Sequence, residues 1–271
     1  MITLDGSVGE GGGQILRTAL SLSIITGQAF AIENIRARRA RPGLQRQHLA
    51  AVNAAAAICS AQVSGAEIHS QTLHFRPQRV TPGNYSFDIG SAGSTTLVLQ
   101  TILPPLMIAD APSSVLIEGG THNPMAPPFE FLDRVFLPLI CRMGPQVQAR
   151  LESCGFYPAG GGSIRVEIDP KKAIQPLTLH DRGGTKACSA TAIIANLPQQ
   201  VAERELAILE RELALTPNQV RIENVSARSP ANVLFVEVQH EDITELFVEL
   251  GERGVRAETV ASRLSTNVHD T

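Results

Sequence analysis

The 271-residue sequence predicts an α+β fold in which a β-α-β-α-β-β unit is repeated in tandem and followed by a smaller α/β unit. The first observation is an internal repeat: G-S-V-G at 6–9 returns as G-S-A-G at 90–93, and I-L-R-T-A-L at 15–20 returns as V-L-Q-T-I-L at 98–103. The copies are about 84 residues apart, which favours supersecondary units packed side by side. The second observation is that similar runs follow each copy. The third is that the pattern changes after Asp169.

The first copy predicts two helices and three further strand-like runs after its glycine-rich opening. A helix begins at Ile15, where an apolar run starts. A strand, an alanine-rich helix and two more strands follow it, and we expect them at Ala29–Ile35, Leu44–Ser60, Ala61–Ile68 and Thr72–Phe75.

The second copy predicts the same order of elements. Its helix at 98–103 is followed by a strand, a helix and two strands, expected at Ser114–Glu118, Pro127–Met143, Val147–Glu152 and Ser163–Ile168. Pro127 is well placed to start a helix, because the first helical N–H needs no partner. Chance similarity between Gly- and Leu-rich stretches is the alternative to a true repeat.

After Asp169 the sequence predicts a smaller α/β unit without a glycine-rich loop. Strand, helix, strand, strand and helix are expected at Lys186–Ala195, Gln199–Ala214, Gln219–Val225, Val233–Gln239 and Arg256–Leu264. The polar junction before it is a plausible boundary. We therefore expect domains at 1–180 and 181–264, and a short tail at 265–271.

Composition limits the class of protein. With 43% hydrophobic and 18% charged residues the chain can bury a core, and it has no apolar run long enough to span a membrane. The four cysteines have no C-x-x-C spacing, and no basic segment opens the chain, so we expect reduced thiols and a cytoplasmic protein. Because the net charge is −3, any nucleic-acid contact needs a local basic patch.

The loop from Gly6 to Gly13 is the first candidate site. Glycines at 9, 11, 12 and 13 surround Glu10 immediately before a helix. A helix start offers free N–H groups to an anion, and a carboxylate can bind a hard cation. The loop is neither a P-loop nor a dinucleotide fingerprint. A flexible turn leading into the helix is the structural alternative.

A cluster of arginines is the second candidate site. Four arginines lie within six residues and are followed by R-Q-H at 46–48: Arg36, Arg38, Arg39 and Arg41. The planar guanidinium suits phosphate, and the cluster should lie near the glycine-rich loop. His48 could donate to the same anion, and Arg17 could reach it from below or pair with Glu33. A solvated basic loop is the alternative.

The second copy carries Gln100 where the first carries Arg17. A neutral amide suits a base or ribose better than a phosphate. Phe131 and Pro127 could lie on either side of a purine ring, or each could be an ordinary packing residue.

Five motifs resemble those of the RNA 3′-terminal phosphate cyclases. The resemblance runs in order from about residue 2 to about residue 264, and its motifs are G-E-G-G-G-Q-I-L-R-T-A-L-S-L, I-R-A-R-R-A-R-P-G-L-Q-R-Q-H-L, S-A-G-S-T-T-L-V-L-Q-T, G-G-T-H-N-P-M-A-P-P and G-F-Y-P-A-G-G-G. The resemblance implies a large domain of such repeats with a smaller inserted α/β domain. It also implies ATP-dependent conversion of an RNA 3′-phosphate to a 2′,3′-cyclic phosphodiester, through adenylate carried first on a histidine and then on the RNA.

The resemblance also implies roles for individual residues. Glu10 resembles the carboxylate that supports a Mg or Mn cation. Residues resembling the adenylate pocket are Gln100, Pro127 and Phe131. Residues resembling the RNA-phosphate site are Arg36, Arg39, Gln47 and His48, with Arg17 as a helper. The expected partners are RNA 3′-phosphate ends, without a membrane, and the protein could form a homodimer.

In one respect the sequence departs from the family. There the large domain resumes after the insert with a third repeat-like unit and the nucleophilic histidine, whose motif is absent here. We therefore expect a chain truncated at its C-terminus, whose tail at 265–271 matches no motif of the family. We expect no catalytic nucleophile within these residues, its position lying beyond Thr271, and no histidinyl adenylate. A non-catalytic RNA-end-binding remnant stays open as the alternative. So does a cyclase-like branch without adenylation, although the cation and phosphate motifs favour the true cyclases.

Overall fold

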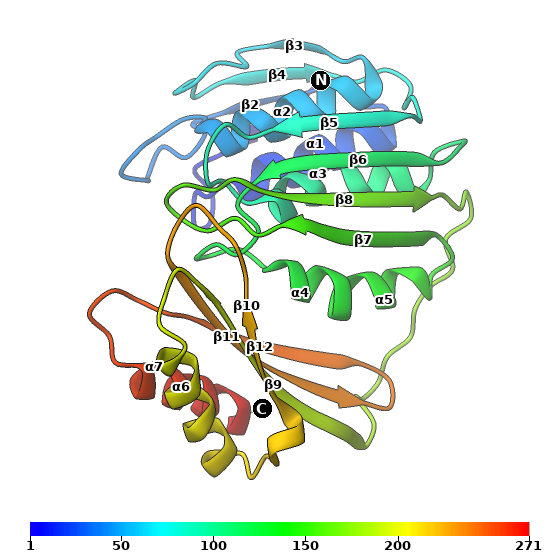
Figure 1. Cartoon of the computed structure of the whole chain (residues 1–271). Coiled ribbons are helices and arrows are strands. Elements are labelled where there is room, and N and C mark those ends of the chain that lie inside the picture. Colours follow the sequence, from blue (N-terminus) through cyan, green and yellow to red (C-terminus); the bar gives the residue numbers. More distant parts are fainter. Residues whose placement is uncertain (271) are drawn as a thin grey trace.

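The computed structural model describes residues 1–270, which form three four-stranded sheets with helices packed on them (Figure 1). The first two sheets share one hydrophobic core and the third sheet has another, and we refer to these two parts as the large and the smaller domain. No helix among the described residues is long and apolar enough to cross a bilayer.

The first repeat forms the first sheet. Its elements are β1 (Ile2–Asp5), α1 (Gln14–Thr26), β2 (Phe30–Glu33), α2 (Arg46–Cys59), β3 (Gln62–Ser64) and β4 (Leu73–Arg76). The strand order is β1-β2-β4-β3. β1 and β2 are parallel, and β4 is antiparallel to both of its neighbours.

The second repeat forms the second sheet with the same topology. Its elements are β5 (Asn84–Asp88), α3 (Thr95–Met107), β6 (Ser113–Gly119), α4 (Phe129–Phe131), the π-helical turn η1 (Leu132–Phe136), α5 (Leu137–Cys141), β7 (Gln146–Ser153) and β8 (Gly162–Asp169). The order β5-β6-β8-β7, with β5 and β6 parallel and the other pairs antiparallel, confirms the predicted repeat.

The helix expected at Pro127–Met143 is divided into α4, η1 and α5. Pro138 lies inside this stretch and has no N–H to donate to the carbonyl of Arg134. The ordinary hydrogen-bond ladder cannot continue unchanged there, and a π-helical turn precedes the proline.

The two repeats share one hydrophobic core. Leu16 and Leu20 of α1, Val52 of α2, and Leu99 and Ile102 of α3 are all buried in it. Helices α1, α2 and α3 contact one another behind the sheets. This packing brings the beginnings of the helices, and the loops before them, into one region.

The smaller domain forms the third sheet, with the order β10-β9-β11-β12. Its elements are β9 (Thr185–Ala195), α6 (Gln200–Glu212), a 3₁₀ turn η2 (Pro217–Gln219), β10 (Val220–Asn224), β11 (Ala231–His240), β12 (Thr244–Leu250) and α7 (Ala257–His269). Strand β12 was not predicted. α7 extends past Leu264, because Leu264 and Ser265 are both buried against the domain. Of the expected tail, Thr271 lies outside the described residues.

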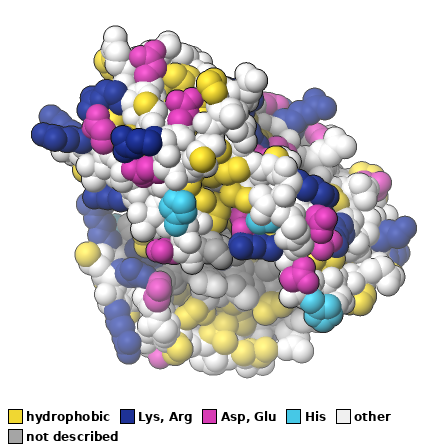
Figure 2. Space-filling view, turned by 90° about the horizontal axis from the view of Figure 1, so that it is seen from below, with side chains coloured by type: hydrophobic (Ala, Val, Ile, Leu, Met, Phe, Trp, Pro, Cys, Tyr) yellow, Lys and Arg dark blue, Asp and Glu magenta, His cyan; other side chains and the backbone are white. Residues whose placement is uncertain are grey.

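The smaller domain is docked on the second repeat. Arg134 of η1 forms an ion pair with Glu237 at 3.1 Å and lies over the ring of Phe235, 5.3 Å from its centroid. Cys154 and Phe156 pack against the same face of the third sheet. Seen from below, charged side chains of both signs lie mainly around the edge of the molecule, and a group of hydrophobic side chains lies nearer the middle (Figure 2).

Candidate active site

The glycine-rich loop leads directly into α1. Gly13 is the N-cap residue, and no side chain caps the helix. The first N–H groups of α1 are therefore available to an anion. A Cβ on Gly13 would collide with the imidazole of His48 and would lie 3.0 Å from Nη1 of Arg17. The missing side chain lets both groups approach the start of the helix.

The arginine-rich loop lies beside this helix start. Arg36 adopts a left-handed backbone conformation, and its Nη1 donates to the carbonyls of Arg41 at 2.6 Å and Gly43 at 3.0 Å. Arg36 thus closes its own loop. Burial, and then the charge of Arg39, lowers the pKa of Arg36.

His48 lies in the first turn of α2 and is buried. The backbone N–H of Gln45 donates to its Nδ1 at 3.2 Å, so the neutral ring carries its proton on Nε2. Burial, and then the charges of Arg36 and Arg17, lowers the pKa of His48 to about 4. At neutral pH the imidazole is therefore an uncharged donor whose Nε2–H faces Gly13.

Arg17 and Arg39, together with Arg36, form a group of cationic side chains around the start of α1, which we call the cationic wall. Arg17 is half-buried on α1, and burial lowers its pKa. Arg39 lies 3.4 Å from the position of a Cβ on Gly12, and its Nη2 is 3.4 Å from Oε2 of Glu10. The Glu10 side chain is 90% exposed, so its carboxylate is free to bind other ligands.

Gln47 has a different position from the other predicted phosphate residues. Its Oε1 accepts a hydrogen bond from the backbone N–H of Ser94 at 2.6 Å. Its Cβ lies 2.9 Å from where a Cβ on Gly93 would be. Gln47 therefore ties the start of α2 to the start of α3, across the two repeats.

An apolar pocket of about 220 Å³ opens between α3 and the α4–η1–α5 segment. All three residues predicted for the adenylate pocket line it: Gln100, Pro127 and Phe131. Thr96 donates from its hydroxyl to the carbonyl of Pro127 at 2.8 Å, which fixes the rim. Arg17 Nε donates to Gln100 Oε1 at 2.9 Å and so connects this pocket to the cationic wall.

One buried pair, next to Phe131 in the chain, was not predicted. His122 Nε2 lies 2.9 Å from Glu130 Oε2, and the hydroxyl of Thr121 lies 2.8 Å from His122 Nδ1. Burial raises the pKa of Glu130, but the hydrogen bond and charge of His122 outweigh it and the net shift is downward. The signal in the sequence was Glu130, which lies between two phenylalanines. A glutamate that is buried among apolar residues needs a hydrogen-bonding or charged partner.

Two comparisons with known proteins bear on the family of this chain. The family model described as RNA 3′-terminal phosphate cyclase matches residues 8–271, and the match includes the tail at 265–271 that was expected to resemble no part of the family. An RNA 3′-terminal phosphate cyclase of Koribacter versatilis (strain Ellin345) is 56% identical over 262 residues, which are 96% of this chain and 74% of that protein. The chain belongs to the RNA 3′-terminal phosphate cyclase family.

Proposed function

We propose that this site binds an RNA 3′-phosphate beside ATP and serves its ATP-dependent conversion to a 2′,3′-cyclic phosphodiester. The observation that carries the proposal is the Arg17–Gln100 hydrogen bond, which joins a cationic, glycine-lined site to an apolar pocket of base-like size. The reaction needs such a pair of sites, because adenylate must reach a phosphate oxygen.

The phosphate would bind at the start of α1. Arg17 and Arg39 supply charge-assisted hydrogen bonds, and His48 supplies a neutral N–H. The free amides of α1 favour the same anion. Arg36 shapes this wall through its bonds to its own loop.

The adenine would bind in the apolar pocket. The ring of Phe131 and the surface of Pro127 offer flat apolar contacts, and Gln100 offers an amide at the rim. The hydrogen bond from Arg17 to Gln100 Oε1 fixes the orientation of the amide group, and therefore also of its two N–H donors.

The proposed chemistry activates the phosphate as an anhydride. An oxygen of the RNA 3′-phosphate attacks the α-phosphorus of the bound ATP, and pyrophosphate leaves, which gives an RNA–adenylate anhydride. The vicinal 2′-oxygen then attacks the RNA phosphorus, loses its proton, and AMP leaves. Arg17 and Arg39 would stabilise the negative charge that builds on the phosphoryl oxygens.

Glu10 would hold a divalent cation together with phosphate oxygens. Mg²⁺ usually needs only one or two carboxylates besides phosphate and water, and the exposed Glu10 carboxylate fits that requirement. Among residues 1–270 no cluster of three His, Cys, Asp or Glu side chains forms a complete metal site. The cation would neutralise phosphate charge.

A second candidate function is recognition of 3′-phosphorylated RNA ends without adenylation. The placement of the histidines favours it: His122 and His240 are buried in pairs with Glu130 and Glu245. His48 faces the phosphate site, and its Nδ1 is already occupied. We propose that none of the histidines at 48, 69, 74, 122, 180, 240 and 269 carries adenylate.

The experiment that separates the two functions is incubation with α-labelled ATP, magnesium and 3′-phosphorylated RNA. Formation of a cyclic RNA end and AMP supports cyclisation. Tight, ATP-independent binding of 3′-phosphorylated RNA, without product, supports recognition alone. Label that remains on the denatured protein and is lost in a single histidine variant would disprove the assignment of the histidines.

A further inference from the structure

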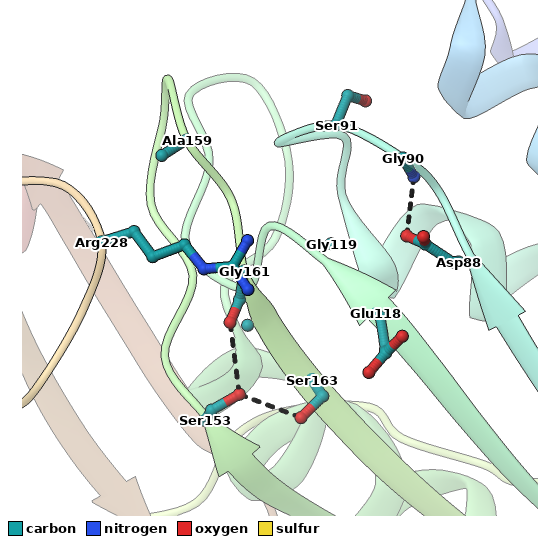
Figure 3. A pocket seen from close by; sticks show the side chains of 11 residues that line it. Asp88, Gly90, Ser91, Glu118, Gly119, Ser153, Ala159, Gly161, Ser163 and Arg228 are labelled. Carbon is teal, nitrogen blue, oxygen red and sulfur yellow. Dashed lines mark hydrogen bonds between the residues drawn. The ribbon is translucent and has the colours of Figure 1, made fainter.

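A second cavity, of about 350 Å³, lies at the carboxyl ends of β5 and β6, beside the loop of the smaller domain that carries Arg228 (Figure 3). Its lining is polar and includes two carboxylates, three hydroxyls and one guanidinium: Asp88, Glu118, Ser91, Ser153, Ser163 and Arg228. Nothing proposed above uses this cavity. Ligands of open α/β sheets bind at this edge, outside the carboxyl ends of parallel strands.

The repeat gives this cavity a counterpart in the first sheet. Asp88 and Glu118 are register partners on β5 and β6, as Asp5 and Glu33 are on β1 and β2. Each aspartate accepts a hydrogen bond from the loop that follows it, from Ser7 N at 2.9 Å or from Gly90 N at 2.7 Å. In the first repeat, the loop after Asp5 continues into the phosphate site. The loop after Asp88 leaves the equivalent edge of the second sheet open to a ligand.

The charges in the cavity are separated. Arg228 extends in from the smaller domain, while Glu118 and Asp88 lie on the strand side (Figure 3). Gly161 lies under Arg228, and a Cβ there would lie 2.6 Å from Arg228 Cδ. Neither Glu118 nor Arg228 forms an ion pair within the described part of the chain. Both groups are therefore free to bind a ligand.

The chemistry of the lining selects the ligand class. No aromatic side chain lines the cavity, so it offers no stacking surface for a base. A carboxylate accepts hydrogen bonds from ribose hydroxyls and repels phosphate, whereas a guanidinium binds phosphate. A ribose at the strand side with a phosphate beside Arg228 satisfies both ends.

The cavity adjoins the phosphate site through the 90–93 loop. Arg46 Nη1 donates to the carbonyl of Gly90 at 2.6 Å, two residues before His48 in the chain. On the other side, a Cβ on Gly160 would lie 2.9 Å from Cα of Ala92. The 90–93 loop thus separates the cavity from the phosphate site. Consecutive nucleotides of one RNA strand need two binding sites that are this close together.

We propose that this cavity binds a ribose–phosphate of the RNA strand on the 5′ side of its terminal phosphate. Arg228 contacts a backbone phosphate, and Glu118 accepts a hydrogen bond from a 2′-hydroxyl. The smaller domain then contributes directly to RNA binding. This inference rests on the proposed function, because it assumes that the strand end lies at Arg17 and His48.

The test is fluorescence anisotropy with the full chain and a labelled 12-nucleotide RNA that ends in a 3′-phosphate. Single 2′-deoxy substitutions are introduced at successive positions before the terminal nucleotide, and the same RNA with a 3′-hydroxyl serves as a reference. At one or two adjacent positions the deoxy substitution should weaken binding about fivefold to tenfold. In Glu118→Ala this penalty should disappear.

Arg228→Ala should weaken binding of both RNAs about tenfold. It should also reduce the slope of log affinity against log salt concentration by about one. Its matched control is Arg253→Ala, which also removes an exposed arginine of the smaller domain. Asp169→Asn, at the opposite end of the second sheet, is the carboxylate control. Unchanged binding in Arg228→Ala, or a deoxy penalty that persists in Glu118→Ala, would overturn the inference. Equal wild-type affinity for the two RNA ends would contradict the proposed function instead, and the Arg228 and Glu118 effects would still be measurable.

Discussion

Arg17 on α1 and Gln100 on α3 occupy equivalent positions in the two repeats, and Arg17 Nε donates a hydrogen bond to Gln100 Oε1 at 2.9 Å. One helical position has thus become a cation in the first copy and an amide in the second. The pair lies where the cationic wall meets the apolar pocket. We infer that it aligns the RNA phosphate with the nucleotide.

Replacing Arg17 tests this alignment. Arg17→Ala should weaken binding of 3′-phosphorylated RNA about tenfold or more, because one charge-assisted contact to phosphate is lost. Gln100→Ala should leave that affinity within about threefold and weaken ATP more, because it removes only the amide at the pocket rim. Titration calorimetry with each ligand separately measures both effects. Equal losses of affinity for both ligands in both variants would refute separate roles for Arg17 in RNA binding and Gln100 in ATP binding.

Gly13→Ala should displace His48 and Arg17, because the new Cβ has no room beside the imidazole. We expect loss of the preference for 3′-phosphate over 3′-hydroxyl RNA, and destabilisation by about 1–3 kcal/mol. Gly12→Ala is the matched control, since its Cβ would meet only the flexible Arg39 side chain at 3.4 Å. A Gly13→Ala protein with wild-type preference would show that the close approach is not needed.

His48 should make the protein less stable in acid. Its pKa is about 4 when folded and about 6.5 when unfolded, so between about pH 6.5 and pH 4 the unfolded chain takes up this proton and the folded chain largely does not. The stability lost by this route grows to about 3 kcal/mol as the pH falls to 4. His48→Gln retains an acceptor for Gln45 N–H but lacks this titration.

Urea unfolding at pH 7, 5.5 and 4.5 measures this difference. The free energy of unfolding of the wild type should fall more steeply with decreasing pH than that of His48→Gln. His180→Gln, which changes an exposed histidine, should parallel the wild type. Identical pH dependence for wild type and His48→Gln would contradict a neutral, buried His48.

Phe131→Ala should weaken binding of ATP about tenfold, because a flat apolar wall of the pocket is removed. Phe131→Leu retains apolar area without a ring, so its affinity for ATP should lie between those of the wild type and Phe131→Ala. Affinity for 3′-phosphorylated RNA in the absence of ATP should not change. If the RNA affinity fell as much as the ATP affinity, the pocket would not be a separate nucleotide site.

Much of the fold was predictable because the repeat preserves both glycines and helix positions. Gly6 and Gly90 follow equivalent strand ends, and Arg17 and Gln100 follow at equivalent helix positions, so the second sheet could be deduced from the first. The clustering of Arg17, Arg39 and His48 also followed, because loops after parallel strands lie at one sheet edge.

Other features depend on contacts that sequence patterns do not record. The bond from Ser94 N to Gln47 joins residues 47 positions apart, and the His122–Glu130 pair depends on burial. Strand β12 has half-buried residues throughout, so it lacks a clear alternation of buried and exposed positions. These elements are fixed by tertiary packing rather than by local preference.

The most direct test is the affinity of the wild-type chain for one RNA sequence ending in either a 3′-phosphate or a 3′-hydroxyl, measured without ATP at fixed salt. We predict at least tenfold tighter binding of the 3′-phosphate end, by about 1.4 kcal/mol or more. This preference should be lost in Arg17→Ala and retained in Arg253→Ala. Equal affinity for the two ends would contradict a 3′-phosphate site at Arg17, Arg39 and His48.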